Sequence, residues 1–255
     1  MALSPYHQGH LDFFCAVYAL INALKLTHGL RLEQAREILG GTLSEVSERP
    51  PLWSAFLRNR TDYYWLVDYI LGRFCREGAL ALRMAKLPPL PPLSAPESFE
   101  GKEALSGLRL ESPPCLSLEK LDEKDLFHQG AEFESSGPVP PRRSPDWRME
   151  SLWPFLRSWL PERRFPGPSP DEGAQGRCLL LRFHRFLPFQ KFPLISHWST
   201  GRFFFRETLQ LYDCTQNKEG IHRLLPRECA LYPEHLGQGR LLGLEPESIY
   251  FLEKA

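Results

Sequence analysis

The chain lacks several features that would assign it at once to a class of protein. Lys and Arg together number 31, as do Asp and Glu, so no excess of one charge points to nucleic acid or an anionic membrane as a partner. No apolar run approaches the ~20 residues of a membrane-spanning helix. Residues 1–7 also lack the basic and apolar segments of a signal peptide. We therefore expect a cytoplasmic protein that binds neither nucleic acid nor membrane.

The six cysteines form no CxxC pair and no group with metal-ligand spacing. A zinc site would need such clustered Cys or His ligands, so we expect no metal and no other cofactor. Six cysteines are also too few to staple 255 residues in a compartment expected to be reducing. Most of them are expected to be buried as small apolar side chains. Only Cys15 has neighbours that suggest chemistry.

The composition divides a single expected domain (1–255) into three segments. Residues 1–86 have mostly helical spacing of apolar residues. Sixteen of the 24 prolines lie between Pro88 and Pro170, so residues 87–175 are expected to form an irregular insertion with one short helix. Residues 176–255 have the pattern of strands. Helices first and an antiparallel sheet last predict an α+β fold.

The expected elements can be placed more closely. Helices are expected over 12–26, 32–39, 52–57, 61–82 and 149–160. Gly29 and Gly40-Gly41 are expected to end the first two helices. Strands are expected over 178–184, 195–205, 208–213, 240–244 and 248–252.

The start of the first helix holds the residues best suited to catalysis. Asp12 is the expected N-cap, which places Cys15 in the first helical turn. A helix N-terminus favours a thiolate, because its unpaired N–H groups and the macrodipole concentrate positive potential there. Gln8 and the Cys15 N–H can donate hydrogen bonds to an oxyanion. These are the parts of a thiol nucleophile.

A histidine and a carboxylate lie on two consecutive expected strands. We consider first a hairpin loop near residues 204–207. In an antiparallel hairpin the numbers of paired residues have a constant sum, here about 410. His197 then lies opposite or diagonal to Asp213. His197 then takes the Cys15 proton, and Asp213 fixes the imidazole tautomer. A turn at Gly201-Arg202 would break this register, and the sequence does not decide between the two turns.

These residues together resemble the papain-like cysteine peptidase superfamily, most closely the bacterial C39-like group. The matching residues are Gln8, Asp12-Phe13-Phe14-Cys15-Ala16, Ser196-His197-Trp198 and Leu211-Tyr212-Asp213, in the family order Gln, Cys, His, Asp. The resemblance implies an N-terminal helical lobe carrying the cysteine, packed on a C-terminal antiparallel sheet carrying the histidine and aspartate. The Cys–Gly–Ser–Cys–Trp signature of the papain branch is absent. The 182-residue separation of Cys15 and His197 fits an insertion at 87–175.

Three functions are compatible with these residues. The first is a cysteine peptidase that hydrolyses a peptide or isopeptide bond of a protein or peptide substrate through a thioester acyl-enzyme. The second is another Cys-His-Asp acyl transfer, by a transglutaminase-like enzyme or a deamidase effector. The third is a catalytically silent papain-like binding module, with a partner protein docking on the Pro-rich insertion. Gln8 ahead of Cys15 favours the peptidase.

Overall fold

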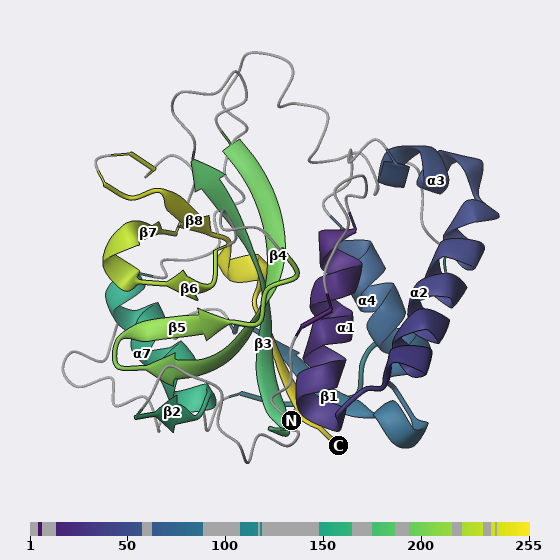
Figure 1. Ribbon diagram of the computed structural model, residues 1–255, viewed down its shortest axis with the longest axis horizontal. Helices are drawn as coiled ribbons and strands as arrows, with labels where there is room; N and C mark the ends of the chain where they lie inside the picture. Colours follow the sequence, from purple (N-terminus) through teal and green to yellow (C-terminus); the bar gives the residue numbers. More distant parts are fainter. Residues whose placement is uncertain are drawn as a thin grey trace.

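The chain forms an α+β fold, as the sequence predicts, in the computed structural model (Figure 1). The structure describes residues 5–6, 14–57, 63–88, 108–116, 118, 148–164, 175–186, 194–215, 221–231, 236–237 and 239–255. Within these ranges the α-helices are α1 Cys15–His28, α2 Leu32–Ser47, α3 Pro50–Leu57, α4 Tyr64–Phe74 and α7 Met149–Trp159. The strands are β1 Leu82–Lys86, β2 Glu162–Arg163, β3 Arg177–Phe186, β4 Leu194–Phe205, β5 Thr208–Leu211, β6 Arg223–Leu224, β7 Cys229–Ala230, β8 Leu242–Leu244 and β9 Tyr250–Lys254.

The described strands join into one mostly antiparallel sheet. Its main path has the order β1-β9-β3-β4-β5-β6, with β2 beside β4 and β8 beside β3. β3 and β4 are the longest strands and pair from Leu179↔Gly201 to Phe186↔Leu194. Figure 1 shows them running between the N-terminal helices and α7. This pair is the frame on which the candidate site is built.

Alternate residues of the sheet face two separate apolar cores. On β3, Cys178 and Leu180 pack with α1–α4, whereas Leu179 and Leu181 pack with α7. Side chains of a strand point to opposite faces in turn, so a continuous apolar run is buried on both sides. The sheet therefore separates the N-terminal helices from α7 (Figure 1).

Helix α1 lies directly on β3 and β4, because its sheet-facing side is made of small residues. Ala16, Ala19 and Ala23 recur at helical spacing and are at most 1% exposed. Small side chains let the helix backbone come close to the sheet. The helix ends at Gly29, as predicted, where a φ of 69° lets its N–H donate to the carbonyl of Lys25 at 3.0 Å.

Two predictions about the ends of these helices are wrong. The N-cap of α1 is Phe14 rather than Asp12, which lies outside the described residues. Helix α2 continues through Gly40-Gly41 to Ser47. A Cβ on Gly41 would meet the ring of Phe74 at 3.3 Å, so this glycine serves close packing of α2 on α4 rather than a helix stop.

The predicted helix at 61–82 is too long. Helix α4 ends at Phe74, and residues 82–86 form β1, which pairs with β9 at the far end of the chain. Because β1 and β9 are far apart in the sequence, no local pattern around residues 82–86 indicates that they pair. The other predicted elements have counterparts: α3, α7, β3, the β4–β5 hairpin, β8 and β9.

Helix α7 shows that part of the Pro-rich segment belongs to the core. Its buried side chains pack on the sheet face opposite α1; they are Leu152, Trp153, Phe155, Leu156 and Trp159. None of the helices in the described ranges is long and apolar enough to cross a membrane.

Candidate active site

The β4–β5 hairpin brings His197 beside Asp213. It turns at Arg206-Glu207, inside the expected loop, and the alternative turn at Gly201-Arg202 does not occur. The ladder ends at Gly201↔Leu211, after which the Tyr212 N–H donates to the carbonyl of Thr200 at 2.7 Å. Asp213 therefore comes level with Ser199, and His197 lies diagonally beyond it on the same face. The predicted hydrogen bond is present: His197 Nε2 lies 2.8 Å from Asp213 Oδ2.

The Asp213 carboxylate is buried and fully engaged. Its side chain has no exposed surface. Ser199 donates its hydroxyl to Oδ2 at 2.6 Å, and the Thr215 N–H donates to Oδ1 at 2.8 Å. Burial alone would raise the pKa of Asp213, but its bonds to His197, Ser199 and Thr215 lower it. An ionised Asp213 can only accept, so Nε2 of His197 carries the proton and Nδ1 is the basic nitrogen of the neutral ring.

Cys15 lies at the first position of α1, beside β4 just past the end of the β5 ladder. The residue is half-buried, and its thiol is hydrogen-bonded to the His197 side chain. The Trp198 N–H also donates to its sulfur. Burial would raise the pKa of Cys15, but the His197 bond and charge, the Trp198 N–H and the charge of Arg182 lower it. The helix N-terminus acts in the same direction.

The imidazole of His197 is held between a carboxylate and two thiols. Burial alone would lower the pKa of His197, but hydrogen bonds with Asp213, Cys15 and Cys214 raise it well above its ordinary value. With the Cys15 pKa lowered, the two shifts favour a thiolate–imidazolium pair at neutral pH. The His197 side chain keeps 19% of its surface exposed, so the imidazole is partly accessible to solvent.

Cys214 also contacts His197, and the sequence interpretation did not identify it as a residue of the site. It is 1% exposed and hydrogen-bonded to that imidazole. Burial raises the pKa of Cys214 despite the opposing effect of His197, so the pKa shifts favour Cys15 over Cys214 as the thiolate. Among the described residues, His197, Asp213 and Cys214 also form the one group whose ligand atoms, within 4.8 Å of one another, could hold a metal ion.

Asn22 and Trp198 lie outside the group formed by Cys15, His197 and Asp213. Gln8 lies outside the described residues. Asn22 has a structural role: its side chain accepts from the Tyr6 N–H at 2.7 Å and donates to the Tyr6 carbonyl at 3.0 Å. Trp198 is 1% exposed and packs against the rings of Tyr64 and Tyr250. It therefore fills the core behind the site.

Ser199 and Arg182 also affect the site without having been singled out in the sequence. Ser199 lies two residues after His197, the spacing that puts two residues of a strand on one face. Arg182 is paired with Trp198 across β3 and β4, and only this register reveals that its charge is close to Cys15.

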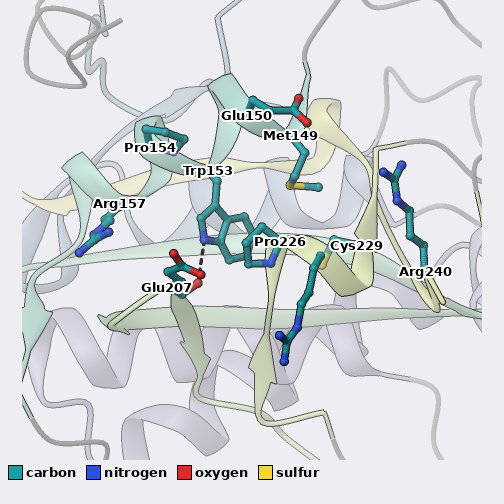
Figure 2. Close-up of a pocket in the computed structure, with 10 residues that line it drawn as sticks. Met149, Glu150, Trp153, Pro154, Arg157, Glu207, Pro226, Cys229 and Arg240 are labelled. Carbon is teal, nitrogen blue, oxygen red and sulfur yellow. Dashed lines mark hydrogen bonds between the residues drawn. The ribbon is translucent and has the colours of Figure 1, made fainter. Parts of the chain in front are cut away.

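A pocket on the α7 side of the sheet is separate from this site (Figure 2). Trp153 Nε1 donates to the carbonyl of Glu207 at 2.8 Å within it. The residues that line it are Met149, Glu150, Trp153, Pro154, Arg157, Glu207, Pro226, Arg227, Cys229 and Arg240. None of the predicted site residues is among them.

Comparison with known proteins adds no identity to this geometry. No protein-family model matches the chain, and no curated protein and no solved structure is detectably similar to it.

Proposed function

We propose that this protein is a cysteine peptidase with a papain-like fold, in which Cys15 is the nucleophile, His197 the general acid and base, and Asp213 the residue that orients His197. The proposal rests on the position of the His197 imidazole. Its Nε2 is hydrogen-bonded to the buried carboxylate of Asp213, and the ring is also hydrogen-bonded to the thiol of Cys15. Cys15 is the sulfur that ionises, as the opposite pKa shifts of Cys15 and Cys214 indicate.

The chemistry follows from these positions. The Cys15 thiolate attacks the carbonyl carbon of the scissile bond, and the first N–H groups of α1 can stabilise the oxyanion because helix ends leave them unpaired. The His197 imidazolium gives its proton to the departing amine, which leaves a thioester on Cys15. His197, now neutral, takes a proton from water as the water attacks the thioester. Collapse releases the acid and restores the thiolate–imidazolium pair.

Alkylation with iodoacetamide at pH 6–7 tests the nucleophile. Cys15 should be alkylated faster than Cys115, the exposed cysteine, because its lowered pKa keeps more of it as thiolate. The modified position is read by mass spectrometry of the digested protein. Preferential modification of Cys115 or Cys214 would contradict the assignment of Cys15.

Turnover assays test the activity itself. Replacing Cys15 by Ala should abolish cleavage of a peptide library, whereas Cys115→Ala is the matched control and should leave it unchanged. The same assay with an added primary amine separates the alternatives. Amine incorporation or glutamine deamidation without cleavage would indicate the transglutaminase-like or deamidase activity. A labelled Cys15 with no turnover would favour the silent binding module.

A cytoplasmic location belongs to the same proposal. All six cysteines are free thiols, and four of them are buried. Free thiols are kept in this state in a reducing compartment. The proposed substrate is accordingly a protein or peptide met there.

A further inference from the structure

A second chain of hydrogen bonds, separate from Cys15–His197–Asp213, joins a serine, a histidine and a carboxylate. Ser196 Oγ lies 2.8 Å from Nδ1 of His184, and Nε2 of His184 is hydrogen-bonded to Oε1 of Glu245. Ser196 is exposed, whereas His184 is 3% exposed. A nucleophile bonded to a base, and a base bonded to an orienting carboxylate, is the arrangement that activates a serine hydroxyl.

The two groups of residues are built in the same way on the sheet. His197 is on β4, and its carboxylate partner, Asp213, follows the end of the neighbouring strand β5. His184 is on β3, and Glu245 directly follows the end of the neighbouring strand β8. His184 and Ser196 are directly paired across β3 and β4, which brings their side chains together on one face.

The proton positions in this second group are determined by Glu245. Burial alone would raise the pKa of Glu245, but the charge of Arg182 and the bonds from His184 and Tyr64 lower it to about 2. Tyr64 donates its hydroxyl to Oε2 at 2.6 Å. The ionised carboxylate therefore accepts from Nε2–H of His184. In the neutral ring, Nδ1 then accepts the proton of the Ser196 hydroxyl.

Arg182 supplies the positive charge that such a centre needs. Its Nη2 donates to Ser196 Oγ at 3.1 Å, and its Nη1 lies 3.5 Å from Glu245 Oε2. A guanidinium beside the hydroxyl stabilises negative charge that develops on a substrate oxygen there. The Arg182 side chain is 14% exposed and is bonded to Ser196, which is itself exposed.

We propose that Ser196 is a second nucleophile of this protein, with His184 as its general base, Glu245 as the positioning carboxylate and Arg182 as the oxyanion donor, and that it acts on esters. Ser196 Oγ forms a bond to the ester carbonyl carbon while its proton passes to Nδ1 of His184. The C–O bond to the leaving group then breaks, and the alkoxide takes that proton. Water hydrolyses the Ser196 ester by the same proton transfers and releases the acid.

A fluorophosphonate probe tests this centre in the full-length Cys15→Ala variant, where the thiol cannot react. The probe phosphonylates an activated serine with loss of fluoride, and mass spectrometry locates the adduct. Ser196 should be modified in preference to the exposed Ser47, whose hydroxyl donates to the Ser44 carbonyl and has no histidine partner. His184→Gln should slow modification by about 10²-fold or more, as expected for loss of a general base.

Hydrolysis of p-nitrophenyl acetate gives a second readout that does not depend on folding of the His184 variant. In the Cys15→Ala background, Ser196→Ala should remove the ester hydrolysis and Ser47→Ala should preserve it. Since Ser196 is exposed, its truncation leaves the core intact, and a thermal melt checks this. Equal hydrolysis in both variants, or adducts spread without preference for Ser196, would overturn the proposal. Neither result affects the assignment of Cys15, which the alkylation experiment tests separately.

Discussion

Thr200 on β4 donates its hydroxyl to the carbonyl oxygen of Ala19 on α1, at 2.6 Å in the buried contact between the helix and the sheet. Ala19 lies about one helical turn after Cys15, and Thr200 lies three residues after His197 on the same strand. This bond therefore ties the helix that carries the proposed nucleophile, Cys15, to the strand that carries the proposed base, His197. It explains how two residues 182 positions apart in the chain keep their relative position.

Thr200→Val should impair the site without changing a site residue. Valine keeps the shape but loses the bond and leaves the buried Ala19 carbonyl without this donor, at a cost of about 1–3 kcal/mol. We expect a lower urea midpoint and slower alkylation of Cys15. Thr42→Val is the matched control, because Thr42 is also buried but donates to Ile38 within α2. Equal loss of Cys15 reactivity in both variants would contradict the positioning role of Thr200.

Asp213→Asn should move the alkaline limb of the pH–rate profile. Asp213 helps to raise the pKa of His197 by stabilising the imidazolium, so without its charge the proton leaves at lower pH. The alkaline limb of kcat/KM should therefore shift to lower pH, and turnover should fall by about 10²–10⁴-fold. Asp68→Asn, which removes a pair with Lys86 at 2.9 Å, is the control. An unshifted limb in Asp213→Asn would show that Asp213 does not act through His197.

Chelation separates a thiol mechanism from a metal centre. His197, Asp213 and Cys214 have ligand atoms close enough for a metal, yet the proposed reaction uses only a thiolate and an imidazole. We expect EDTA to leave turnover unchanged and added Zn²⁺ to inhibit it, because zinc binds the same imidazole and thiol atoms. Activity lost in EDTA and restored by Zn²⁺ would instead identify this group as a metal site.

Two helical glycines should respond to alanine in opposite directions. A Cβ on Gly72 in α4 would lie 2.1 Å from the backbone oxygen of Pro114, whereas one on Gly40 in α2 meets nothing within 4 Å. Gly72→Ala should therefore destabilise the protein by about 1–3 kcal/mol or more through overpacking. Gly40→Ala should stabilise it by about 0.5–1 kcal/mol through helix propensity. Urea unfolding measures both, and a stabilised Gly72→Ala would contradict the observed approach of Pro114.

Local patterns were enough for the parts of the fold that depend on neighbouring residues. The apolar spacing after Cys15 and the glycine at 29 predicted α1 and its end. The strand patterns around His197 predicted the β4–β5 hairpin, and one of its two possible turns placed Asp213 opposite or diagonal to His197; the structure decided between the turns. These features need only residues adjacent in the chain or joined by a short turn, where propensity and turn geometry dominate.

Predictions failed where a distant segment decided the outcome. Gly40-Gly41 has the composition of a helix stop, but packing of Gly41 on Phe74 keeps α2 helical. The helix expected over 61–82 ends at Phe74, and pairing with β9 makes residues 82–86 a strand. In both cases a tertiary contact outweighs a local preference, which amounts to no more than about 1 kcal/mol per residue.

The sequence by itself determined which residues can carry the chemistry and in what order: a cysteine at a helix start, then a histidine and an aspartate on a hairpin. Only the tertiary structure decided that Cys15 rather than Cys214 is the thiol favoured as thiolate, because burial and the surrounding donors shift the two pKa values in opposite directions. It also brought Ser196, His184 and Glu245 together. Hydrogen bonds act over about 3 Å, and only strand register and helix packing bring atoms from distant parts of a chain that close.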